Sequence, residues 1–177
     1  MPIWHYVVSY TATTSHAFAW VHMKGKPMGT EKTIAMIKPE GMLHQQFIHH
    51  RLSQHGLTIV DRKMIVLDEK MLSTIYADLP PVFKAPTMAH LNGQTVEVLV
   101  IQGENAIRAV MNEVGDHKDP EQCDARQIRS VLAKKTDSKE MRISITPRLT
   151  YCKNFVHRAN GPREVEVQAK LFGINLK

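Results

Sequence analysis

Residues 33–41 read TIAMIKPEG, a short apolar run that ends in a lysine and is followed by a Pro–x–Gly break. An apolar run of this length, bounded by Pro39 and Gly41, predicts a buried strand that leads into a turn. Lys38 then lies at the carboxyl end of the strand, the place where open sheets bind ligands. We therefore expect a cation beside a ligand at the edge of a sheet.

Outward from this strand, helix and strand patterns alternate along the chain. Apolar residues at helical spacing, with capping residues or glycines at their ends, mark helices over 43–52, 68–79 and 106–114, a short helix from Asp119, and a last helix from Pro162 to Leu171. Runs rich in β-branched or apolar residues mark strands over 57–67, 95–101 and 141–145. This alternation predicts an α/β or α+β sandwich in which helices cover one sheet.

The composition favours a globular, basic protein. The 177 residues include 23 Lys or Arg and 17 Asp or Glu, a formal net charge of +6. Such a surplus suits polyanionic partners such as nucleotide phosphates, RNA or an anionic membrane surface, and it suits a solvated basic surface equally well. No apolar run approaches the roughly 20 residues that a membrane span needs. Cys123 and Cys152 form no C-x-x-C unit, which fits a reducing compartment.

The first thirty residues differ from the rest. They contain no Asp or Glu, as in organellar transit peptides, but also no Arg, which transit peptides usually contain. The patch IWHYVVSY, residues 3–10, is equally consistent with an added strand. We expect an N-terminal extension over 1–30, one domain over 31–177, and an intracellular protein, either cytoplasmic or mitochondrial.

A second motif lies near the end of the chain. KNFVHRANGP, residues 153–162, places Asn154 three residues before His157. Alone, His157 is either a reactive imidazole or a structural or solvated one. Together with Lys38-Pro39-Glu40-Gly41, however, it resembles the nucleoside diphosphate kinase family, in which a strand ends in Lys-Pro-Asp-Gly and a later Asn-x-x-His carries the nucleophilic histidine.

Three further segments follow in the order of that family: YADL at 76–79, GENA at 103–106 and QIR at 127–129. The resemblance covers about residues 31–173. It implies a ferredoxin-like α+β sandwich, with an antiparallel sheet covered by helices, and usually a homo-oligomer.

The same resemblance implies the roles of individual residues. His157 would take the γ-phosphate of a nucleoside triphosphate and pass it to a diphosphate. The nucleotide-binding residues would be Lys38, Tyr76, Phe83, Arg129 and Asn154. Cations and positioning suit this chemistry, because a transferring phosphoryl group spreads charge over several oxygens. Mg²⁺ would be carried by the nucleotide phosphates rather than by a metal site of the protein.

The chain departs from the family near these residues. Met111 replaces an arginine, His117 or Lys118 replaces a threonine, Arg158-Ala159 replace Gly-Ser, and Gln168 replaces a glutamate. We expect Arg108, Arg126, Arg158 and Gln168 to act as auxiliary groups.

The spacing between Arg129 and Asn154 is about fifteen residues longer than in the family, and we assign the extra basic segment to an insertion over 134–149. Two hypotheses follow: a divergent kinase, or a weak or inactive domain that serves as a structural or nucleotide-binding subunit of a larger, RNA-containing or mitochondrial assembly. In the second hypothesis, the insertion and the N-terminal extension would bind protein or RNA partners.

Overall fold

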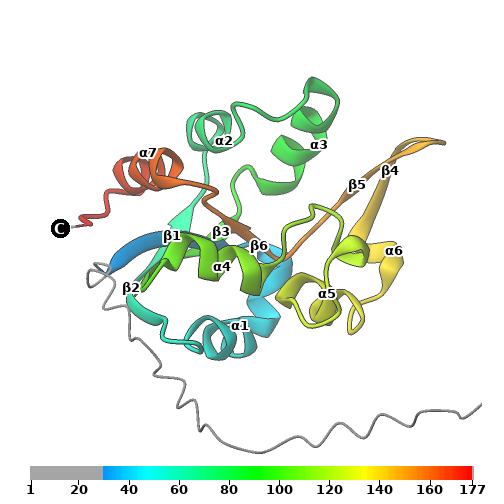
Figure 1. Cartoon of the computed structure of the whole chain (residues 1–177). Helices are drawn as coiled ribbons and strands as arrows, with labels where there is room; N and C mark the ends of the chain where they lie inside the picture. Colours follow the sequence, from blue (N-terminus) through cyan, green and yellow to red (C-terminus); the bar gives the residue numbers. More distant parts are fainter. Residues whose placement is uncertain (1–29, 177) are drawn as a thin grey trace, which may run out of the picture.

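A computed structural model describes residues 30–176 (Figure 1), so the predicted N-terminal extension and its strand or transit-peptide alternatives lie outside the described residues, apart from Thr30. Four strands form an antiparallel sheet in the order β2-β3-β1-β6. These strands are β1 (Glu31–Ile37), β2 (Thr58–Val66), β3 (Thr95–Gly103) and β6 (Val156–Arg158). A separate hairpin pairs β4 (Arg142–Thr146) with β5 (Leu149–Cys152). The predicted α+β fold class is thereby confirmed.

Helices cover both faces of the four-stranded sheet (Figure 1). They are η1 (Pro39–His44), α1 (Gln45–Leu52), α2 (Glu69–Ile75), α3 (Pro81–Leu91), α4 (Ala106–Val114), η2 (Pro120–Gln122), α5 (Ile128–Ala133), α6 (Ser138–Met141) and α7 (Pro162–Phe172). Ala35 and Ile37 of β1 pack with α1, α4 and α5, whereas Ile34 and Met36 pack with α2, α3 and α7. Residues 34–37 of β1 are all apolar because this part of the strand is buried on both faces. No helix among residues 30–176 is long and apolar enough to cross a membrane.

Three elements differ from the sequence-based expectations. The helix predicted over 68–79 ends earlier, at Ile75, and Pro81 begins a separate helix, α3, at a position that tolerates proline because it needs no N–H. The helix expected from Asp119 is a single 3-10 turn. His157, expected beside the start of a helix, lies on the short strand β6, and α7 begins five residues later.

The predicted insertion over 134–149 is ordered and tied to the domain. It contains α6 and β4, and Met141 at the end of α6 packs in the core with α4 and α5. The hairpin of β4 and β5 projects from the body of the domain (Figure 1). The assignment of this segment as an insertion, and the docking role expected for it, remain predictions.

Candidate functional site

The two motifs of the sequence are joined by hydrogen bonds. Lys38 donates its backbone N–H to the Phe155 carbonyl at 2.8 Å and its amine to Asn154 Oδ1 at 2.7 Å. Glu40 Oε1 accepts the backbone N–H groups of Asn154 and Phe155 at 3.1 and 3.2 Å. Phe155 has a φ of 60°, a strained value for an aromatic residue. A side chain at Gly41 would meet the Phe155 carbonyl at 2.6 Å, so this close approach requires glycine.

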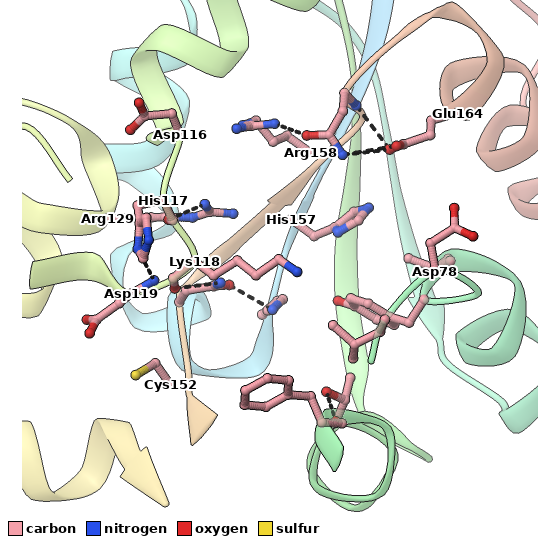
Figure 2. Close-up of a pocket in the computed structure, with 18 of the residues that line it drawn as sticks. Asp78, Asp116, His117, Lys118, Asp119, Arg129, Cys152, His157, Arg158 and Glu164 are labelled. Carbon is pink, nitrogen blue, oxygen red and sulfur yellow. Dashed lines mark hydrogen bonds between the residues drawn. The ribbon is translucent and has the colours of Figure 1, made fainter. Parts of the chain in front are cut away.

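A cavity of about 1160 Å³ opens at this junction (Figure 2). It is larger than the roughly 300–1,000 Å³ of typical small-molecule sites. The structure brings together at its wall eight of the residues predicted from the sequence: Lys38, Tyr76, Phe83, Arg129, Asn154, His157, Arg158 and Gln168. Two others are not brought to it. Arg108 lines a smaller, separate pocket, and the exposed Arg126 pairs with Asp124.

The His157 imidazole is neutral near pH 7. Removal of the ring from water, together with the positive charges of Lys38, Arg129 and Arg158, lowers the pKa of His157 to about 3. The Tyr76 ring lies edge-on at 5.4 Å between centroids, and the side-chain amide of Gln168 contacts His157 Nε2 at 3.0 Å. A neutral imidazole keeps a lone pair with which it can attack an electrophile.

Two buried cations line the same cavity. Burial lowers the pKa of Lys38 to about 8, with the Glu40 carboxylate opposing this shift. Arg129 donates to the carbonyls of Gly115, His117 and Val156 at 3.1, 2.8 and 2.8 Å, which fixes its guanidinium. Burial and then the neighbouring Arg158 lower the pKa of Arg129 to about 10. Both groups remain charged at pH 7.

Arg158 is the third buried cation. It donates Nε to the Gly115 carbonyl at 3.2 Å and a terminal nitrogen to the Asn160 side chain. Because Arg129 donates to the same carbonyl, the two guanidinium groups lie close together. Buried like charges of this kind are costly unless an anion joins them, so the cavity is suited to a polyanion.

Several buried polar atoms at the cavity lack a protein partner. Within residues 30–176, no hydrogen bond reaches the hydroxyl of Tyr76, Nε of Arg129 or Oε1 of Gln168. Burial raises the pKa of the Tyr76 phenol, so this hydroxyl stays protonated and can donate. Buried polar atoms are almost always paired in folded proteins, so these atoms require a partner from water or from a ligand in the cavity.

Sequence reasoning missed the function of Glu40 and His90. His90 on α3 contacts Glu40 Oε2 at 2.8 Å. Burial alone would raise the pKa of Glu40, but the hydrogen bond with His90 and the charge of Lys38 outweigh it and lower the pKa to about 2. The ionised carboxylate can therefore accept hydrogen bonds from the backbone N–H groups of Asn154 and Phe155, which precede His157 in the chain. Glu40 was visible within its motif, whereas nothing in the sequence around His90 marked it.

Comparison with known proteins agrees with this geometry. A family model described as nucleoside diphosphate kinase matches residues 31–173, and the chain belongs to this family. The nucleoside diphosphate kinase of Moorella thermoacetica is 28% identical over 150 residues, which cover 82% of this chain and 95% of the relative. The Metallosphaera sedula protein of the same name is 24% identical over 148 residues, or 82% and 94% of the two chains.

Solved structures show the same fold. The Borrelia burgdorferi nucleoside diphosphate kinase, with bound vanadate and ADP, has a TM-score of 0.65 and 17% identity, covering 81% of this chain and 86% of that one. The Halobacterium salinarum enzyme in complex with CDP has a TM-score of 0.64 and 23% identity, covering 81% and 88%. The predicted family membership is confirmed.

Proposed function

We propose that this protein transfers the γ-phosphoryl group of a nucleoside triphosphate to a nucleoside diphosphate through a phosphohistidine at His157. The observation that carries the proposal is a neutral imidazole in one cavity with three buried cations, Lys38, Arg129 and Arg158. This arrangement supplies both a nucleophile and positive charge for phosphate oxygens. The vanadate, ADP and CDP named with the two solved relatives support the same class of ligand.

The contact with Gln168 determines which ring nitrogen attacks. As placed, the Nε2 amide of Gln168 lies 3.0 Å from Nε2 of His157 and can only donate to it. In our proposal the amide is turned over, so that Oε1 accepts the proton of His157 Nε2 and Nδ1 keeps its lone pair. This orientation also gives the otherwise unpaired Oε1 a donor. Nδ1 then forms a bond to the γ-phosphorus while the bond to the β–γ bridging oxygen breaks and the diphosphate leaves. A second diphosphate attacks the phosphohistidine and restores neutral His157.

The remaining predicted residues bind and orient the nucleotide. Lys38 and Arg129 pair with phosphate oxygens, and the free hydroxyl of Tyr76 donates to one of them. Asn154, whose Oδ1 accepts from Lys38, faces the ribose, and Phe83 lies on the wall formed by α3. Arg158 is the auxiliary cation closest to the reacting atoms.

Mg²⁺ enters this scheme as part of the substrate. Within residues 30–176, no three His, Cys, Asp or Glu side chains gather in a way that could hold a metal ion. In our proposal the ion is bound by the substrate phosphates, which is the usual mode for Mg²⁺ with nucleotides. When present, the ion neutralises charge on the β- and γ-phosphate oxygens.

Incubation with γ-labelled ATP tests the proposal. We expect an acid-labile, alkali-stable label on the protein, and we expect His157→Ala to abolish both labelling and exchange while nucleotide binding and the fold remain. Arg126→Ala, which changes an exposed side chain outside the cavity, should label normally. Undiminished labelling of His157→Ala would exclude this nucleophile. Nucleotide binding without any label in the unmodified protein would instead favour the nucleotide-binding subunit.

A further inference from the structure

We propose that Lys118 binds the phosphates of the nucleotide, and that the β4–β5 hairpin holds Lys118 in position through Arg142. This inference rests on the proposed nucleotide cavity, but not on phosphoryl transfer by His157. It gives a function to a lysine at or next to the position of the family's phosphate-binding threonine, and to the segment predicted as an insertion.

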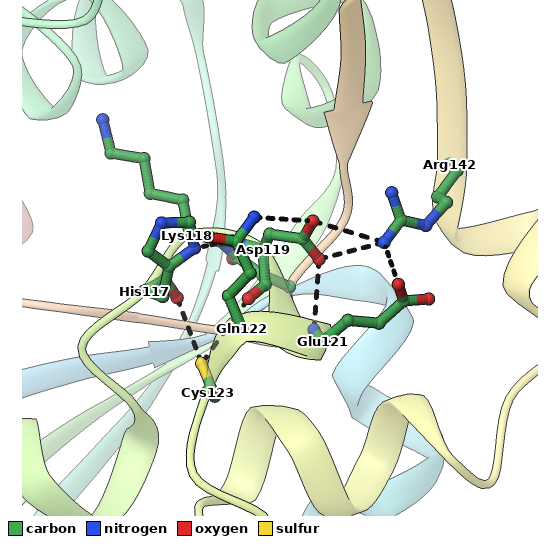
Figure 3. A network of polar contacts seen from close by, with 8 residues as sticks. His117, Lys118, Asp119, Glu121, Gln122, Cys123 and Arg142 are labelled. Carbon is green, nitrogen blue, oxygen red and sulfur yellow. Dashed lines mark hydrogen bonds and ion pairs between the residues drawn. The ribbon is translucent and has the colours of Figure 1, made fainter.

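The Lys118 side chain lies at the cavity, and its amine is available to bind a ligand. It lines the cavity, and in Figure 2 it extends across the cavity from the loop between α4 and η2. Its side chain is exposed, and among residues 30–176 its amine has no ion-pair or hydrogen-bond partner. In Figure 3 it points away from the network formed by its neighbours. Lys118 is thus a cation directed at the site with no protein anion to neutralise it.

The backbone beneath this side chain is anchored at three consecutive residues. The His117 carbonyl accepts from Arg129 at 2.8 Å and from the Cys123 thiol at 3.3 Å. The Lys118 carbonyl accepts from Asn154 Nδ2 at 3.1 Å. The Asp119 carboxylate accepts from Arg142 at 3.1 and 3.2 Å. These contacts hold the backbone that carries Lys118, so little backbone freedom is lost when its side chain binds a ligand.

The anchor at Asp119 comes from the hairpin. Arg142 is the first residue of β4, and it also pairs with Glu121 at 2.7 Å, so one guanidinium joins two carboxylates of the same loop (Figure 3). Asp119 additionally caps η2 by accepting the Glu121 N–H at 3.1 Å. The hairpin therefore supports the wall of the cavity that carries Lys118.

Lys118 also makes up for a cation that the family has and this chain lacks. Met111, at the position of the family's arginine, packs against the core with α7 and lines the smaller pocket rather than the cavity. Arg108 lines that same pocket and therefore does not replace it. Lys118 supplies positive charge to the cavity from the loop that follows α4.

Titration of ADP by calorimetry tests the function of Lys118 without turnover. We expect Lys118→Met to weaken ADP binding at least fivefold and to lessen its dependence on salt, because an ionic contact is lost. Lys118→Arg should stay within about threefold of the unmodified protein, because it keeps the charge. Lys139→Met, an exposed lysine on α6, is the matched control and should bind normally. A smaller loss in Lys118→Met, an equal loss in the control, or no recovery in Lys118→Arg would overturn the proposal.

A double-mutant cycle tests the hairpin. If Arg142 acts by positioning Lys118, Arg142→Gln should weaken ADP binding severalfold alone and add nothing to Lys118→Met. Losses that add, or no loss in Arg142→Gln, would overturn this part of the proposal. Because the readout is binding, a protein that binds ADP through Lys118 but carries no phosphohistidine would refute the proposed kinase activity alone. A protein that binds no ADP would refute both.

Discussion

The floor and the rim of the cavity are built differently. The floor consists of Lys38, Arg129, Asn154 and His157. Short hydrogen bonds hold these side chains: Lys38 donates to Asn154, Arg129 donates to the carbonyls of His117 and Val156, and His157 contacts Gln168. The rim consists of an exposed lysine and of ion pairs that water reaches, such as Arg142 with Asp119. The four floor residues keep the family motifs, whereas the departures include the exposed Lys118 at the rim and the buried Arg158 and Gln168 beside His157. Removing a buried partner leaves a polar group unpaired, whereas at the rim water can replace it.

Replacement of a floor cation should have the largest effect. Arg129→Met removes a guanidinium that contacts three carbonyls and, in our proposal, a phosphate. We expect kcat/KM to fall about 10²–10³-fold, the usual cost of losing one group that stabilises the transition state. Steady-state exchange assays with Arg126→Met as the control would measure it. Equal losses of activity in Arg129→Met and in this control outside the cavity would contradict the role of Arg129.

The support beneath the floor should have an intermediate effect. Glu40→Gln keeps the shape but removes the charge that accepts two N–H groups and contacts His90. A charge-assisted hydrogen bond contributes roughly 1.5–3 kcal/mol, so we expect kcat to fall about tenfold with a smaller change in KM. His90→Gln, which retains a donor, should lose less than His90→Ala. An unchanged kcat in Glu40→Gln would show that the hydrogen bonds of Glu40 do not position His157.

The same carboxylate gives the fold an acid-sensitive contribution. Because the folded pKa of Glu40 lies below its usual value, at about 2, its contribution to stability is complete above pH 4.5. That contribution is lost as the pH falls from 4.5 towards 2. In Glu40→Gln, this part of the acid-unfolding profile should be absent in a thermal-unfolding series.

Replacement of Gln168 should have the smallest effect, an increase in the rate of phosphohistidine formation. Gln168→Glu restores the family's carboxylate, which stabilises a developing imidazolium better than an amide, and we expect phosphohistidine formation to become severalfold faster. In the unmodified protein the labelling rate should change less than about twofold between pH 7 and 5, because His157 is already neutral with a pKa of about 3. Gln168→Glu should raise that pKa, so a fall in rate towards low pH should emerge. A slower variant with the same pH profile would show that residue 168 does not tune His157.

Sequence reasoning located the floor well because its residues lie in compact local motifs. Lys38 follows a recognisable apolar strand, and Asn154 and His157 are three residues apart. The auxiliary residues Arg108 and Arg126 were expected because each lies one helical turn before Met111 or Arg129. Arg126, however, precedes the start of α5 at Ile128, so this spacing does not apply, and Arg108 lies with Met111 at the smaller pocket.

The rim could not be predicted from the sequence, since it depends on contacts across the chain. Arg142 meets Asp119 only because β4 and β5 form a hairpin beside η2, and β5 and β6 are too short to show a strand pattern. Asn154 likewise reaches the Lys118 carbonyl 36 residues away. Local patterns hold no information on such pairings.

The three buried cations of the cavity tie the protein's lifetime to its ligand. Lys38, Arg129 and Arg158 repel one another in the free protein, so an anion in the cavity relieves a cost that the folded chain otherwise carries. Ligand at about 100 times its Kd adds roughly 2.7 kcal/mol to the free energy of unfolding. Since proteases act on transiently opened chains, the amount of this protein in a cell should rise and fall with the concentration of nucleotide.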